Sequence, residues 1–270
     1  RDYDQSASIP NYVLGTFNTP GEGRCGFTKK FVNSYLMADG TRFTDKPDYD
    51  KIEFVNEVSG RDPRLAQTIR TTKGLNFSNC ITGYQPHKYI IEANLNSSAA
   101  SYNDLPLFRM AEVYLNYAEA TLGNNGKTTD ATALKYFNAL RTRAGVAAKN
   151  SLTFEDIRHE FRLETAFEGL YWYFLVRRGY YQQQEMVNYV NNQYRNASYF
   201  KKSTHEYVLS EDYTAPGPSV ATATAKNLTL PIADTDQTKN PLLKPDGSGN
   251  ITTVAYQFGN REVEDTDLFK

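Results

Sequence analysis

The sequence predicts a mainly α fold in which tetratricopeptide-like helical hairpins carry long loops and minor β-structure. Two observations support this prediction. Apolar residues recur at helical spacing through residues 105–194, whereas proline and glycine interrupt the chain before and after that stretch. Hydrophobic residues make up 40% of the 270 residues, which is enough for a packed core. We expect a single domain over residues 1–270, with a loop-rich segment at 1–104, a helical core at 105–194 and a loop-rich C-terminal segment at 195–270.

The first 104 residues contain few sustained helical patterns. Residues 30–38 fit one short helix, because Phe31, Tyr35 and Ala38 share a face. Alternating apolar residues over 88–92 predict a short strand. A loop segment of this length is usually functional or docked onto other structure. We therefore expect it to pack against the helical core, or against a part of the protein that precedes it.

Two helices joined by a short turn are predicted next. The first spans residues 106–122 and the second residues 130–144, and Gly123 and Gly145 follow them as stop signals. Their apolar stripes consist of Leu107, Ala111, Tyr114, Ala118 and Leu122 in the first helix, and Ala133, Phe137, Leu140 and Ala144 in the second. Small residues at the contact and a short connection predict an antiparallel helical hairpin.

A third helix is predicted over residues 153–178. Thr153 and Asp156 resemble a capping box at its start, with Asp in place of the usual Glu. Its apolar residues are Ile157, Leu163, Phe167, Leu170 and Phe174. A fourth helix is expected over residues 180–194, and a short strand over residues 228–232, where Pro231 would stop it.

Charge, hydropathy and residue usage exclude several classes of function. The net charge is -1, so the chain has no basic field to attract nucleic acid. The longest apolar run has seven residues, at 170–176, far below the roughly 20 that a membrane-spanning helix needs. Two cysteines and three dispersed histidines predict no metal site. The sequence also lacks a glycine motif of the kind that binds phosphates, so it predicts no cofactor. Cys25 and Cys80 form either one disulfide or two buried thiols.

Three glutamates on the predicted third helix are the one arrangement that imitates a catalytic site. Glu160, Glu164 and Glu168 follow i, i+4, i+8 spacing beside His159. Paired carboxylates serve as acid and base in glycoside hydrolysis only where they flank a bound sugar. We expect structural ion pairs instead, with Arg158 and Arg162 as partners.

Candidate ligand-binding residues lie on the predicted loops, where binding groups concentrate. Arg42, Phe43 and Tyr49 combine rings with charged groups in one loop, and Asn76 and Tyr84 lie on another. A sugar is held by a ring against its apolar face and by polar groups on its hydroxyls. These five residues are the predicted glycan contacts. The single tryptophan, Trp172, lies in an aromatic block of the third helix, and we expect it in the core rather than at a sugar platform.

Several segments, taken in order, resemble the SusD/RagB family. They are residues 34–40, 61–65, 82–84 with 88–89, 104–120 (DLPLFRMAEVYLNYAEA), 139–145 (ALRTRAG), 157–169 (IRHEFRLETAFEG) with 175–179 (LVRRG), and 230–232 with 240–241. The resemblance covers about residues 31–241. The chain departs from it at Phe161, where the family usually has an arginine, and at residues 170–174 (LYWYF), where the family is more polar. Members are also about twice as long, so this chain resembles their C-terminal portion.

The resemblance implies a function. Such proteins are non-catalytic lipoproteins of the outer-membrane surface in Bacteroidetes-type bacteria, where they bind glycans or sometimes peptides. They form a lid over a SusC-like TonB-dependent transporter, to which the ligand is delivered. A lipid anchor absent from this chain would supply the membrane attachment. The alternatives are a protein-interaction module of a transporter complex, or a peptide binder, without glycan binding. A glycoside hydrolase is the third reading.

Overall fold

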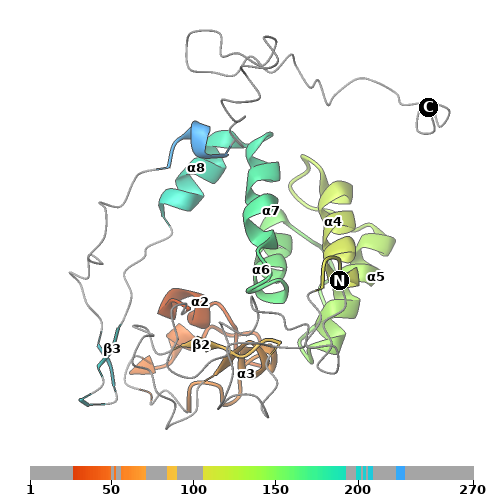
Figure 1. Ribbon diagram of the computed structural model, residues 1–270. Coiled ribbons are helices and arrows are strands. Elements are labelled where there is room, and N and C mark those ends of the chain that lie inside the picture. The colour runs from red at the N-terminus through yellow and green to blue at the C-terminus, as the bar shows by residue number, and fades with distance from the viewer. Residues whose placement is uncertain are drawn as a thin grey trace, which may run out of the picture. The chain divides into compact units, whose positions relative to one another are not determined.

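The computed structural model describes residues 27–49, 52, 56–70, 84–89, 106–192, 199–201, 203–204, 206–208 and 223–228 (Figure 1). This part of the chain is mainly α-helical, as the sequence predicts. The chain divides into two compact units, Arg1–Thr222 and Ala223–Lys270. In the second unit the structure describes a 3-10 helix, η5 (Ala225–Leu228), at the start of the predicted strand over 228–232. The remainder of that strand lies outside the described residues, and the single domain stays a prediction.

Short elements make up the described residues before position 90. They are α2 (Lys29–Asn33), η1 (Phe43–Asp45), α3 (Arg64–Thr68) and the strands β1 (Ile69–Arg70) and β2 (Gln85–Pro86). The two strands pair antiparallel, with Ile69 opposite Pro86. A second antiparallel pair joins β3 (Tyr199–Lys201) to β4 (Glu206–Val208). Minor β-structure therefore accompanies the helices, as predicted.

Two expectations for this segment are wrong in their bounds. The helix predicted over 30–38 ends at Asn33, because Arg61 donates to the carbonyl oxygens of Val32 and Tyr35 and occupies acceptors of a longer helix. The strand predicted over 88–92 does not begin at residue 88, where the chain forms a turn. Tyr89 has a φ of 64°, which is incompatible with an extended strand, and residues 90–92 lie outside the described ranges.

The predicted hairpin is present as α4 (Met110–Leu122) and α5 (Ala131–Arg143). The first helix begins four residues later than expected, which leaves Leu107 exposed instead of in the apolar stripe. The buried apolar side chains are Ala111, Leu115, Ala118 and Leu122 from α4, and Ala133, Phe137 and Leu140 from α5. Asp130 caps α5 by accepting a hydrogen bond of 2.8 Å from the backbone N–H of Ala133.

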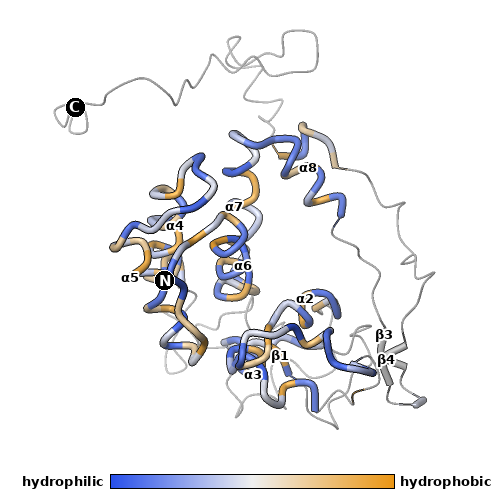
Figure 2. The backbone as a smooth tube through the Cα atoms, turned by 180° about the vertical axis from the view of Figure 1, so that it is seen from behind, coloured by the Kyte–Doolittle hydropathy of each residue, from blue (hydrophilic) through white to orange (hydrophobic). Residues whose placement is uncertain are grey.

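The prediction of one helix over 153–178 is wrong, because two helices occupy this stretch. They are α6 (Phe154–Glu164) and α7 (Leu170–Gly179), and a turn separates them. Phe167 and Gly169 both have left-handed backbones, with φ of 68° and 75°, so a right-handed helix cannot continue through them. The fourth helix, α8 (Gln183–Asn191), is shorter than the predicted 180–194. Figure 2 shows hydrophobic and hydrophilic residues alternating along α6, as expected of a helix buried on one side.

The loop-rich segment packs onto the end of α6. A cluster of buried residues joins the two parts: Phe31, Val32, Tyr35, Leu65, Ile69 and Tyr84 from the segment, with Leu163 and Ala166 from the end of α6 and the turn after it. Figure 1 shows α2, α3 and β2 together at this end of α6. The expected docking of the segment onto the helical core is thus confirmed for its described residues.

Aromatic rings fill the space between α6 and α7. Phe174 stacks on Phe161 with ring centroids 4.6 Å apart, and on Phe154 at 5.6 Å. Phe161, where the family usually has an arginine, therefore serves as a core ring. Trp172 is not a core residue: it is 39% exposed, so that prediction is wrong.

The capping box of α6 has a measurable role. Thr153 accepts from the Asp156 backbone N–H, and Asp156 accepts from the Thr153 backbone N–H. Thr153→Ala is expected to lower the free energy of unfolding by about 1 kcal/mol, because a helix-terminal N–H loses its acceptor. Thr132→Ala, at an exposed position of α5, is the matched control and is expected to change it by less than about 0.5 kcal/mol. Equal losses in denaturant unfolding would contradict the assignment.

No helix within the described ranges is both long enough and apolar enough to cross a membrane.

Candidate functional site

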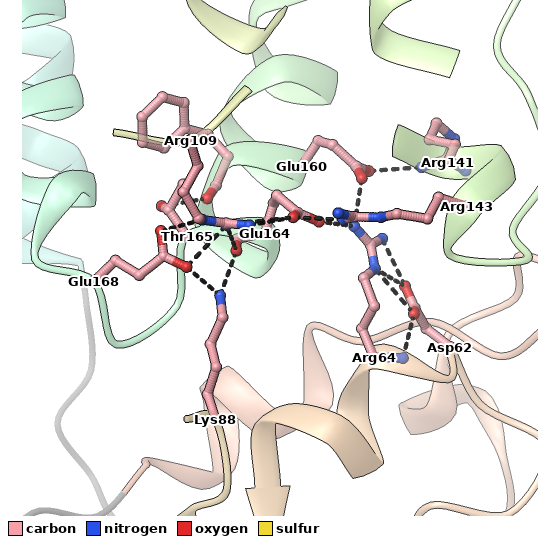
Figure 3. Close-up of polar contacts among 11 residues, drawn as sticks. Asp62, Arg64, Lys88, Arg109, Arg141, Arg143, Glu160, Glu164, Thr165 and Glu168 are labelled. Carbon is pink, nitrogen blue, oxygen red and sulfur yellow. Dashed lines mark hydrogen bonds and ion pairs between the residues drawn. The ribbon is translucent and has the colours of Figure 1, made fainter. Parts of the chain in front are cut away.

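The three glutamates singled out in the sequence lie at one end of α6. Glu160 and Glu164 belong to the helix, and Glu168 follows in the turn before α7. Glu160 is fully buried, and the other two carboxylates are nearly so. Figure 3 shows basic side chains reaching them from several directions, with Arg64 and Lys88 approaching from the loop-rich segment. We call the three glutamates and their basic partners the charged network; these partners are Arg64, Lys88, Arg109, Arg141 and Arg143.

Glu160 is held by two arginines. Its Oε1 lies 2.5 Å from Nη1 of Arg64, and its Oε2 lies 3.0 Å from Nη1 of Arg141 in α5. Arg64 is itself fixed by Asp62, whose Oδ2 accepts from Nη2 at 2.8 Å. Burial alone would lower the pKa of Arg64, but Asp62 and Glu160 outweigh it and raise the pKa above its ordinary value. The Glu160 carboxylate therefore faces, in Arg64, a guanidinium that keeps its charge.

Glu164 and Glu168 share further basic partners. Arg143 of α5 lies 2.5 Å from Glu164, and Arg109, just before α4, lies 2.8 Å from Glu168. Lys88 forms an ion pair with Glu168 as well. Burial would raise the pKa of Glu164, but the arginines around it, Arg143 foremost, outweigh burial and hold that pKa below its ordinary value. All three carboxylates are thus ion-paired, and they tie α5, α6, the start of α4 and the loop-rich segment together.

This arrangement is unsuited to acid–base catalysis. A general acid needs a carboxyl group that keeps its proton near neutral pH and reaches the substrate. Glu164 has the opposite pKa direction, and Glu160 is out of contact with solvent. The expected structural role of the glutamates is what this geometry favours. His159 has a structural role as well: its Nε2 lies 2.8 Å from the Ser34 carbonyl oxygen, and burial lowers its pKa.

The predicted ion-pair partners of the three glutamates are wrong. Arg158 pairs with Glu155 and donates to the hydroxyl of Tyr189, and the Arg162 guanidinium lies 5.4 Å from the ring centroid of Phe31. Both arginines project from another side of α6 than the buried glutamates, because two residues along a helix turn the side chain by about 200°. The true partners come from residues 64, 88, 109, 141 and 143.

A hollow of about 320 Å³ opens beside the charged network. Its lining includes Arg64, Lys88, Arg109, Arg143 and Glu164. Each of these side chains already forms an ion pair within the network. A ligand entering here would have to compete with those pairs, so the hollow offers few available donors.

The five predicted ligand contacts do not form one exposed group. Phe43 and Tyr84 are buried, with 1% and 0% of their surface exposed. Arg42 is exposed, and Tyr49 is half-buried with its ring at a right-angled contact to Phe43, centroids 6.2 Å apart. Asn76 lies outside the described residues. A sugar would reach the two buried rings only by displacing the side chains that cover them.

Neighbouring charged groups explain why these rings are buried. The Arg61 guanidinium lies 4.2 Å from the ring centroid of Phe43. The Tyr84 hydroxyl donates to Glu57 and accepts from Lys29 Nζ at 2.8 Å. Among the described residues, therefore, both rings serve the packing of the loop-rich segment.

A larger cavity, of about 550 Å³, lies where the C-terminal ends of α4 and α7 meet. None of its lining residues is among the sequence-predicted contacts. The sequence signal that could have indicated this cavity is the pair of arginines in the last turn of α7, Arg177 and Arg178. Cations at the C-terminal end of a helix are, however, equally expected from the helix dipole. The contact of Arg177 with Asn116 and Glu119, which brings these polar groups together, follows from no local pattern.

Comparison with known proteins gives consistent matches. The sequence model of the SusD family matches residues 71–245. A SusD-like protein from Bacteroides ovatus is 35% identical over 180 residues, which are 61% of this chain and 31% of that protein. A crystal structure with a xylogluco-oligosaccharide is 26% identical with a TM-score of 0.55, covering 86% of this chain and 50% of that chain. A SusD-like carbohydrate binding protein from Bacteroides fragilis, 23% identical with a TM-score of 0.53, covers 86% and 51% and supports the fold alone.

The matched proteins are longer than this chain. It spans about a third of the curated relative, at 31%, and about half of the two solved structures, at 50% and 51%.

Proposed function

This chain belongs to the SusD family, and from that membership we propose that it binds glycan oligosaccharides without cleaving them. One observation carries the proposal: a solved structure 26% identical to it, with the same fold over 86% of this chain, holds a xylogluco-oligosaccharide. Glycan capture needs rings and hydrogen-bonding groups held in place, and it requires no bond to break. The packed helices of this chain suit that role.

The charged network supports the non-catalytic part of the proposal. Retaining and inverting glycosidases both need two carboxyl groups on either side of the scissile bond. Here Glu160 and Glu164 form ion pairs with arginines, which are Arg64, Arg141 and Arg143. Such pairs hold elements together, and they leave neither of these two glutamates without an arginine partner.

The remaining parts of the proposal concern the setting. We propose that the full-length protein is attached by a lipid anchor to the outer-membrane surface and passes its ligand to a SusC-like TonB-dependent transporter. A surface capture step ahead of a transporter favours moderate affinity, since the ligand must also leave. Family membership supports this setting.

The test is binding of the 270-residue chain to xylogluco-, malto- and laminari-oligosaccharides, measured by isothermal titration calorimetry. We expect heat of binding with at least one of these probes, and no new reducing ends after prolonged incubation. The heat-unfolded chain is the control and is expected to bind none of them. Release of reducing ends would favour a hydrolase, and capture of the transporter with no glycan binding would favour a protein-interaction module.

A further inference from the structure

The cavity at the ends of α4 and α7 has the dimensions of a ligand site. Its volume of about 550 Å³ lies within the range of about 300–1,000 Å³ typical of small-molecule sites. The groups that face it and could bind a ligand are Asn116, Glu119, Asn124, Arg177, Arg178 and Tyr181. Two amides, a carboxylate, two guanidinium groups and a phenol therefore line one hollow. Such a set offers both donors and acceptors of hydrogen bonds.

Contacts between the two helices hold part of this set in place. Arg177 of α7 donates from Nη2 to Oδ1 of Asn116 at 2.8 Å and from Nε to Oε2 of Glu119 at 3.1 Å. Asn116 and Glu119 lie one turn apart in α4, so the single guanidinium of Arg177 bridges them. An amide whose oxygen accepts from Arg177 still has two N–H donors for a ligand. The polar groups are thus oriented before a ligand arrives, which lowers the entropic cost of binding.

An aromatic ring completes the chemistry. Tyr181 lies in the turn after α7 and is 63% exposed, and its backbone N–H donates to the Arg178 carbonyl oxygen at 3.0 Å. That hydrogen bond fixes the backbone that carries the ring at the cavity. Tyr173, also exposed, precedes Arg177 by four residues and so shares its face of α7. A flat ring beside hydrogen-bonding groups matches a sugar, which has apolar C–H faces and hydroxyl edges.

The charges around the cavity favour a neutral ligand. Arg177 and Glu119 neutralise each other at 2.5 Å, and Arg178 lies 3.6 Å from Glu185 of α8. A polyanion would meet no excess of positive charge from these groups. A neutral sugar hydroxyl, in contrast, can accept from a guanidinium and donate to a carboxylate without breaking the ion pair.

We propose that this cavity is a binding site for a neutral oligosaccharide, with Tyr181 as the stacking ring and Asn116, Arg177 and Glu119 as the polar contacts. The inference rests on the proposed function, to which it adds a location and a ligand class. The site lies in the helical core at some distance along the sequence from Arg42, Tyr49 and the other loop residues predicted as contacts.

Two substitutions test the site in the full 270-residue chain. Tyr181→Ala removes the ring, and Asn116→Ala removes the amide. Each is expected to weaken by about tenfold the binding of whichever xylogluco-, malto- or laminari-oligosaccharide the unmodified chain binds. Tyr180→Ala is the matched control, because Tyr180 is the adjacent tyrosine, is 73% exposed and is not among the cavity residues. It is expected to bind as the unmodified chain does. Thermal unfolding of each variant checks that the fold is intact.

The outcomes separate this inference from the proposed function. Undiminished binding by both cavity variants would overturn the site and leave glycan binding standing. An equal loss in Tyr180→Ala and Tyr181→Ala would also overturn it, since the effect would not be specific to the cavity. Tighter binding of oligogalacturonate than of the neutral probes would overturn the ligand class. Failure of the unmodified chain to bind any of these sugars would overturn both the site and the proposed function.

Discussion

Replacing Glu160 by alanine is expected to lower the free energy of unfolding by about 3–5 kcal/mol, because it leaves two buried arginines without their shared carboxylate. The Glu160 side chain is fully buried, and its two oxygens lie 2.5 Å from Arg64 and 3.0 Å from Arg141. Each guanidinium would be left desolvated and short of an acceptor. Equilibrium denaturation in urea, followed by far-UV circular dichroism, measures the loss.

Glu155→Ala is the matched control in the same helix. Glu155 is 66% exposed and pairs with Arg158 three residues later, and a surface pair of this kind contributes less than about 1 kcal/mol. The Glu160 variant should therefore lose several times more stability than the Glu155 variant. A loss below about 1 kcal/mol for Glu160→Ala would mean that the charged network does not hold the fold together. In that case the buried glutamates would need another explanation.

The helices that could be predicted from the sequence are those whose limits are set by local chemistry. The hairpin of α4 and α5 follows from apolar periodicity and from Gly123 and Asp130, which lie at the two ends of its connecting turn. The break between α6 and α7 does not follow in the same way. Apolar spacing continues across it, and Phe167 adopts a left-handed backbone that its residue type does not favour. Tertiary packing decides that turn, so periodicity alone predicts one helix where there are two.

The charged network was predictable only in part. The i, i+4 spacing places Glu160 and Glu164 on one side of a helix, and burial of that side follows once other elements cover it. The partners are distant: Arg64 is 96 residues from Glu160 in sequence. A single sequence carries no local signal for such a pairing. It favours the nearest arginines on the same helix, and that prediction is incorrect.

The sugar contacts predicted in the loops are wrong at two positions for a different reason. Rings next to charged residues in a loop predict a sugar contact, but the same composition describes a ring buried under its own charged neighbours. At Phe43 and Tyr84 the structure has the second arrangement. Exposure separates the two cases, and exposure is a property of the packed chain that these short irregular segments do not encode by periodicity.

Tyr84→Ala is expected to lower the free energy of unfolding by about 3–5 kcal/mol, as for other large buried rings. The ring belongs to the cluster that joins the loop-rich segment to α6. Tyr84→Phe keeps the ring and removes the hydroxyl, so Glu57 loses a donor and Lys29 an acceptor in a buried site. It is expected to cost about 1–3 kcal/mol.

Tyr84→Phe also distinguishes a structural Tyr84 from a ligand contact. Tyr180→Phe removes a hydroxyl from an exposed ring and is the matched control, expected to leave the midpoint of urea unfolding unchanged. If Tyr84 is structural, Tyr84→Phe shifts that midpoint while the folded fraction binds oligosaccharide with unchanged affinity. If the ring is a ligand contact, affinity falls and the midpoint stays. The second result would mean that the loop-rich segment opens to admit a sugar, because the hydroxyl is enclosed by Glu57 and Lys29 in the arrangement described here.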